Sequence, residues 1–271
     1  MAGLPLKPLA LMALAREFKA ISGESATLAV AGSGELPAVL RRELVRGEGA
    51  EPAAVTASWK GATGLVWVQA GPLTAADQAE LQAASVAKVP IVALIAGAAG
   101  AAAGSAAAAH QRLPYVLATN HVTAGPGQGF PLDEIARAVG RSVGEHASGL
   151  AFRLPVLRDG ILESLVRSAS KRNAMVGSLI PVPGADLPVL VLTQLRLVLR
   201  IAHAYGEPVD TKRLPELLGV VLGSLGLRGV ARQLAGSLGP GWLVKGVVAY
   251  GGTRAIGAAA IRYFERKSPA G

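Results

Sequence analysis

Two glycines and a serine in front of a helix are the residues of this chain whose types and spacing best fit chemistry. LAVAGSGELPAVLRREL, residues 28–44, runs from an apolar, strand-like segment through Gly32, Ser33 and Gly34 into an amphipathic helix. The backbone amides of such a turn can hold a phosphate group at the helix N-terminus. Phosphate chemistry also needs a lysine and a hydroxyl, and neither stands at the required place after the glycines. The segment therefore has the outline of a phosphate-binding loop without its charged groups.

Other catalytic or metal chemistry finds little support in the residue types. The chain has no cysteine, which excludes disulfides, thiolate catalysis and cysteine-ligated metal centres. None of the four histidines has a second histidine or a glutamate at ligand spacing. They are His110, His121, His146 and His203. We therefore expect no catalytic residue, no metal ion and no cofactor.

The charge of the chain is unevenly distributed. Of the net charge of +9, residues 1–150 contribute nothing, with 11 basic and 11 acidic side chains, whereas residues 151–271 have 16 basic and 7 acidic ones. A basic excess indicates an anionic partner. Few aromatic residues and no nucleic-acid motif argue against nucleic acid, so the apolar basic half favours an anionic membrane surface. A protein partner or a homo-oligomer stays open.

Short apolar runs alternate with helical patterns in the neutral half, which predicts a mostly parallel sheet with flanking helices. Thr74 is expected to cap the second helix, with Asp77 three residues later in a near capping box. The predicted strands are residues 28–31, 54–59, 65–70, 90–96 and 115–119, and the helices lie near residues 38–46, 74–87 and 132–146.

This half resembles a small-GTPase domain in three segments, AGSGELPAVLRREL, GLVWVQAGPLTAADQAELQ and VPIVALIAGAAG. The resemblance places Pro37 where the family has the lysine of its phosphate loop, and Ala38 where it has the hydroxyl. The second segment lacks Asp-x-x-Gly, and the third has Ala96, Gly97 and Ala99 at the positions that recognise guanine. It implies a degenerate P-loop GTPase-like fold without hydrolysis, because phosphoryl transfer depends on those charged groups. Nucleotide binding through backbone amides alone stays open at the degenerate loop, whose residues are Gly32, Ser33, Gly34 and Pro37.

Long helical patterns broken by proline and glycine fill the basic half. Two helices are joined by IPVPGADLP, a hinge in which Asp186 is expected to cap the second helix and Pro188 to occupy its first turn. The hinge residues are Pro181, Pro183, Gly184, Asp186 and Pro188. The second helix has a narrow polar stripe, Thr193, Arg196, Arg200 and His203, typical of a helix buried in a bundle or lying at a membrane interface.

Small residues recur on single faces of the later helices. In the last helix they are Gly246, Ala249, Thr253, Gly257 and Ala260. Glycine inside a helix costs about 0.5–1 kcal/mol relative to alanine, and close helix packing can offset that cost. We predict an N-terminal helix or linker over residues 1–25, an α/β domain over 26–150 and an all-α, Gly-rich helical domain over 155–267.

The basic half resembles the YcjF-like helical domain of unknown function (domain of unknown function 697), through KRNAMVGSLIPVPGADLPVLVLTQLRLVLRIAHAYG, ELLGVVLGSLGLRGVARQLA and AYGGTRAIGAAAIRYFE. The resemblance implies a helical domain that follows a small-GTPase domain, commonly in bacterial inner-membrane proteins, and it implies no catalytic residue.

The function expected is that of a noncatalytic GTPase-like scaffold or regulator, at the cytoplasmic side of the inner membrane or in the cytoplasm. Charges interrupt every long apolar stretch of the basic half, so we expect shallow or re-entrant association with the membrane. The candidate contacts are Arg196, Arg200, Arg228, Arg232, Lys245 and Arg254. The alternatives are a nucleotide-binding GTPase with unorthodox contacts and a soluble basic adaptor for an acidic partner.

Overall fold

The computed structural model describes Arg16 and residues 25–97, 112–125, 127–179, 187–207 and 241–267. It forms two compact units, which divide between Ser164 and Leu165. This division falls inside helix α7 (Arg158–Leu179), after the boundary at residues 150–155 that the change of sequence texture predicts. The predicted N-terminal part, residues 1–25, lies almost wholly outside the described residues.

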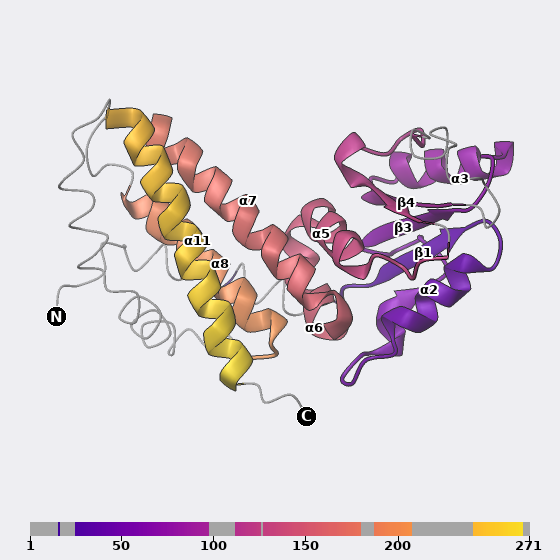
Figure 1. The fold of residues 1–271 in the computed structure, drawn as a ribbon, viewed down its shortest axis with the longest axis horizontal. Helices are drawn as coiled ribbons and strands as arrows, with labels where there is room; N and C mark the ends of the chain where they lie inside the picture. Colours follow the sequence, from indigo (N-terminus) through magenta and orange to yellow (C-terminus); the bar gives the residue numbers. More distant parts are fainter. Residues whose placement is uncertain are drawn as a thin grey trace. The chain divides into compact units, whose positions relative to one another are not determined.

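The first unit is an α/β unit with a five-stranded, all-parallel sheet in the order β2-β1-β3-β4-β5 (Figure 1). Its parallel strands and flanking helices confirm the predicted fold class. The connections from β1 and from β3 leave in opposite directions, so these neighbours form the switch point of a doubly wound fold. The strands are β1 (Leu28–Gly32), β2 (Val55–Thr56), β3 (Gly64–Gln69), β4 (Ile91–Ala96) and β5 (His121–Ala124).

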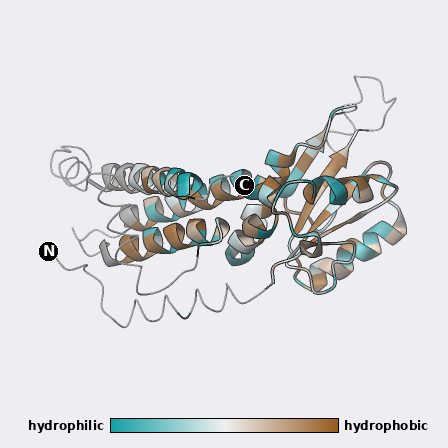
Figure 2. Cartoon of the chain, turned by 90° about the horizontal axis from the view of Figure 1, so that it is seen from below, coloured by the Kyte–Doolittle hydropathy of each residue, from teal (hydrophilic) through white to brown (hydrophobic). Residues whose placement is uncertain are grey.

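Strands β3 and β4 are continuous apolar runs because both faces of the sheet are covered. On one face, Leu81 and Ala84 of α3 pack with Trp67, and Figure 2 shows the strands in the hydrophobic colour. Helices α2 and α5 cover the opposite face, onto which Val30 and Val66 alternate. The helices of this unit are α2 (Leu36–Leu44), α3 (Ala75–Val86), α5 (Leu132–Ser142) and α6 (Ala147–Arg153), with 3-10 turns at Pro52–Ala54, Ala118–Asn120, Gly144–His146 and Pro155–Leu157.

The predicted position of the fifth strand was wrong, because β5 lies at His121–Ala124 and not at residues 115–119. Tyr115 adopts a left-handed conformation, with φ of +64°, which an extended strand does not allow. The chain joins the sheet only after Asn120, whose side-chain amide donates to the carbonyl oxygen of Ile91 at 3.3 Å. The second strand is also shorter than predicted, since β2 includes two residues of the range 54–59.

The described part of the second unit is helical, with residues 165–179 of α7, α8 (Leu187–Ala204) and α11 (Gly241–Lys267). The rings of Tyr205 and Phe264 stack at 6.3 Å, which brings the C-terminal ends of α8 and α11 together. Asn173 of α7 donates to Thr253 of α11 at 2.7 Å. With Val166 against Gly257, this bond shows that α7 runs antiparallel to α11.

Small residues of α11 lie where the helices approach closely, as the sequence predicts. A Cβ atom on Gly257 would lie 2.6 Å from a methyl carbon of Val166, and Thr253 and Ala260 are fully buried. Gly246 lies in the part of α11 whose side-chain surroundings are not described. The stripe on α8 lies within a helix that is largely buried in its C-terminal half, which favours the bundle interpretation.

Candidate functional site

Gly32 ends strand β1 at a point where the neighbouring strand β3 leaves no room for a side chain. Its φ is +138°, and a Cβ atom would lie 2.0 Å from the carbonyl oxygen of Val68 in β3. Gly34 has φ of +79° but faces open space. Gly32 is therefore required by strand packing, whereas Gly34 is required only by its own backbone conformation.

The N-terminus of α2 offers few donors to an anion. Pro37 has no amide proton, lies in the first turn and is buried. The N–H groups of Ala38 and Val39 donate to the carbonyl oxygen of Glu35, at 3.0 and 3.2 Å. The exposed Glu35 side chain adds a negative charge next to this turn. Two amides of the first turn of α2 are therefore engaged within the turn, and Pro37 removes a third donor.

A carboxylate from the first turn of α3 binds the loop after β1. Asp77, in the first turn of α3, accepts a hydrogen bond from the Ser33 hydroxyl at 2.8 Å. Its other oxygen accepts from the backbone N–H and the hydroxyl of Thr74, at 3.0 and 2.8 Å. The Thr74 hydroxyl in turn accepts from the Asp77 N–H at 3.2 Å, which completes the predicted capping box. The two loops at the switch point are thus tied together by one nearly buried carboxylate.

The pKa of Asp77 is lower than its usual value. Desolvation by burial raises this pKa, but the hydrogen bonds from the Thr74 backbone, the Ser33 hydroxyl and the Thr74 hydroxyl together outweigh it. Asp77 is therefore ionised near neutral pH. A phosphate placed beside this carboxylate would meet a fixed negative charge.

The described side chains at the carboxyl ends of β3 and β4 carry no charge. Gln69 ends β3, accepts from the Trp67 indole at 2.9 Å and donates to the carbonyl oxygen of Gly71 at 2.9 Å. Its amide is buried and engaged on both sides, and it has no charge for magnesium. At the end of β4, Ala96 and Gly97 offer no side-chain donor, and Ala99 lies outside the described residues.

Two further features of the described residues are the lack of a metal site and the position of an arginine of α2 next to β1. Among those residues no group of three His, Asp or Glu side chains could hold a metal ion. Arg41 of α2 donates to the carbonyl oxygen of Val30 in β1 at 2.7 Å, so this guanidinium braces the strand. In the described residues, the side chains of this edge hold strands and loops together.

The structure describes some of the site residues predicted in the basic half. Arg196 of α8 and Arg254 of α11 are exposed, and Arg200 is half-buried. His203 is also half-buried, and burial lowers the pKa of its imidazole. Pro188 lies in the first turn of α8, as expected, and Lys245 lies in the first two turns of α11, both without described side chains. The other predicted residues lie outside the described ranges: Pro181, Pro183, Gly184, Asp186, Arg228 and Arg232.

Two exposed cations of α7 were not among the predicted membrane contacts but lie near one of them. Lys171 and Arg172 are exposed on α7, next to Asn173, whose amide binds Thr253 of α11. Arg254 follows Thr253 directly, so these cations lie on adjoining helices. The signal in the sequence was the KR pair before a buried asparagine, but only the pairing of the helices gives it meaning.

The comparisons with known proteins bear on the helical part. Residues 153–270 match the family described as Domain of unknown function (DUF697). The basic half thus matches the family that it resembles, whereas no family match covers the preceding α/β half. Neither a curated protein nor a solved structure matches the chain. The small-GTPase resemblance therefore rests on the parallel sheet, whose strand order is shared by other doubly wound folds.

Among the described residues, no helix is both long enough and apolar enough to cross a bilayer.

Replacing Gly32 and Gly34 separately tests why the loop contains glycines. We expect Gly32→Ala to lower the free energy of unfolding by about 3 kcal/mol or more, because its Cβ would strike the backbone of β3. Gly34→Ala, the matched control, should cost only about 1–2 kcal/mol through its backbone conformation. Urea unfolding followed by Trp59 and Trp67 emission, in a Trp242→Phe background, measures both. Equal costs would contradict a packing role for Gly32.

Acid unfolding tests the carboxylate of Asp77. Its pKa is lower in the folded chain than in the unfolded chain, so its stabilisation is present above about pH 4 and is lost as the pH falls through the folded pKa. Asp77→Asn should cost about 1–3 kcal/mol at pH 7 and flatten this loss. Glu80→Gln, an exposed change on the same helix, should leave the pH dependence intact. An Asp77→Asn variant with the wild-type pH profile would contradict the assignment.

Proposed function

We propose that this protein is a noncatalytic membrane-associated scaffold or regulator. In this proposal the α/β unit is a structural, GTPase-like module, and the helical unit binds the anionic surface of a membrane. The cytoplasmic side of a bacterial inner membrane is the location that fits the YcjF-like resemblance.

The charge of the helical unit is the observation that carries the proposal. Residues 165–179, 187–207 and 241–267 contain ten Lys or Arg side chains against two glutamates. Both glutamates, Glu207 and Glu265, lie at the C-terminal ends of α8 and α11, where Glu207 pairs with Lys267 at 2.7 Å. An unbalanced positive surface on apolar helices is typical of proteins that bind anionic lipid headgroups.

The carboxyl edge of the sheet supports the noncatalytic part of this proposal. Asp77 binds Ser33 at the switch point, and Pro37 removes a donor from the helix N-terminus. Among the described residues, no side chain at this edge is placed to neutralise a phosphate, so a regulatory role without hydrolysis fits better than a GTPase cycle.

Vesicle flotation of the full chain tests membrane binding. We expect flotation with vesicles of phosphatidylglycerol and phosphatidylethanolamine, and little with phosphatidylcholine alone. Neutralising Lys171, Arg172, Arg196 and Arg254 to Gln should weaken binding about 100-fold or more, since each cation near an anionic surface contributes about 1 kcal/mol.

The matched control removes four exposed cations from the α/β unit, by Arg42→Gln, Lys60→Gln, Lys88→Gln and Arg112→Gln. It changes the net charge by the same amount and should bind almost as well as the wild type. Circular dichroism shows that both variants are folded. Equal loss in both variants, or no flotation of the wild type, would contradict the proposal and favour a soluble adaptor.

A further inference from the structure

Contacts between the three helices determine which residues lie at the same height in the helical unit. The bond from Asn173 to Thr253 sets α7 against α11. The Tyr205–Phe264 stack and the Glu207–Lys267 ion pair align each α8 residue with the α11 residue 59 or 60 positions later. By this register Arg196 lies level with residues 255–256.

Four exposed cations therefore lie at one height on three helices. Arg172 and Lys171 are level with residues 254 and 255 of α11, because α7 runs antiparallel from the Asn173–Thr253 bond. Arg196 falls within about two residues of Arg254 along the axis, or about 3 Å. We name Lys171, Arg172, Arg196 and Arg254 the cation belt.

On one side of the cation belt the helices are apolar and free of acids. This apolar end consists of residues 174–179, 187–195 and 241–253, which contain no Asp or Glu and only Lys245 as a cation. Met175 is 62% exposed and Val189 is 44% exposed, and Leu190, Val191 and Leu192 are partly exposed.

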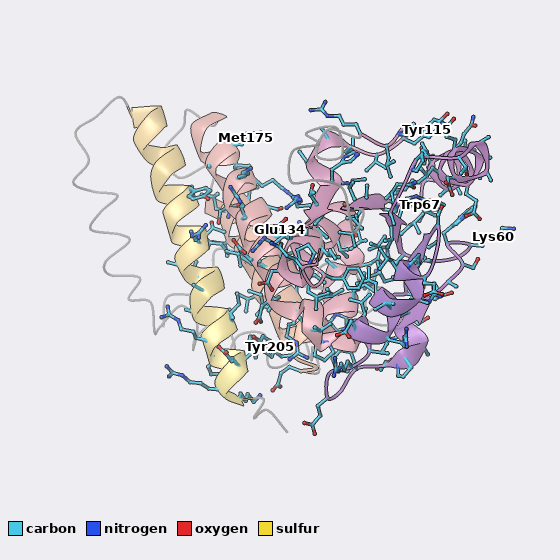
Figure 3. All side chains as sticks on the ribbon, turned by 45° about the vertical axis from the view of Figure 1, so that its right-hand side comes forward. Lys60, Trp67, Tyr115, Glu134, Met175 and Tyr205 are labelled. Carbon is cyan, nitrogen blue, oxygen red and sulfur yellow. The ribbon has the colours of Figure 1, made fainter. Side chains whose placement is uncertain are left out.

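The other end of the helical unit has a different surface. Figure 3 shows Met175 and Tyr205 at opposite ends of the unit. Near Tyr205 lie Glu207 and Lys267, which form an ion pair, and the exposed Glu265 and Arg266. Charges of both signs favour contact with water at that end. The two ends of the described helices therefore differ in polarity.

We propose that the apolar end enters an anionic bilayer end-on, with the cation belt at the level of the lipid phosphates. This inference rests on the proposed function and adds the site and its orientation. From Val189 to Arg196 the helix rises about 10 Å, at about 1.5 Å per residue. That depth reaches the boundary of headgroups and acyl chains, about 5–10 Å. Helix α11 rises about 20 Å from Arg254 to Gly241, so it enters the roughly 30 Å core without crossing it.

Charge complementarity selects lipid over a second copy of this chain as the occupant. Two apolar ends meeting face to face would bring two cation belts together, with no acid in the described residues of either end to neutralise them. Anionic phospholipids provide apolar chains and phosphates in the required order, with the phosphates outermost.

Single-cysteine labelling tests the orientation, because the chain has no cysteine of its own. Met175→Cys and Val189→Cys place an environment-sensitive nitrobenzoxadiazole label at the apolar end of the full chain. Arg262→Cys, an exposed position toward the other end of α11, is the matched control. With phosphatidylglycerol vesicles we expect emission to rise severalfold at positions 175 and 189 and to be quenched by nitroxide lipids, with no change at 262.

Flotation of the same labelled samples separates two kinds of failure. If the protein floats while labels at 175 and 189 stay in water, or if the label at 262 is the one buried, the end-on inference is wrong and the proposed function stands. If the protein does not float, both fail. Chemical crosslinking of a soluble dimer through positions 175 and 189 would also overturn the inference, in favour of a second copy.

Discussion

The hydrogen bond from Ser33 to Asp77 is the interaction on which the arrangement of the sheet edge depends. It joins the loops after β1 and β3 at the switch point, where doubly wound folds usually bind a ligand. Thr74 fixes the same carboxylate from its own helix. The protein thus places an internal negative charge at the edge of the sheet where doubly wound folds usually bind ligands.

Features that depend on local chemistry can be predicted from the sequence. Apolar runs such as GLVWVQ and IVALIA predict buried parallel strands, and Thr74 with Asp77 predicts a capping box. The strand predicted at residues 115–119 was wrong, because a run of strand-forming residues does not reveal a left-handed Tyr115. The partner of Ser33 was also beyond reach, since 44 positions separate it from Asp77 and only the fold brings them together.

In the helical unit, the sequence predicts a face of small residues on α11 but not the helix packing that this face allows. Gly257 lets α11 approach Val166 of α7, and the buried Asn173–Thr253 bond sets the register of the two helices. A buried polar pair of this kind can specify one register among several. That register brings Lys171 and Arg172 level with Arg254, and no spacing along one helix could have shown it. The buried contact between α7 and α11 thus determines which cations lie at the same height.

Calorimetric titration of the full chain with GTP, GDP and ATP, in the presence of magnesium, tests most directly whether the sheet edge is closed. With the Asp77 carboxylate bound to Ser33 and Thr74, the account predicts no heat of binding and no shift in the unfolding temperature. Saturable one-to-one binding tighter than about 1 mM would contradict it.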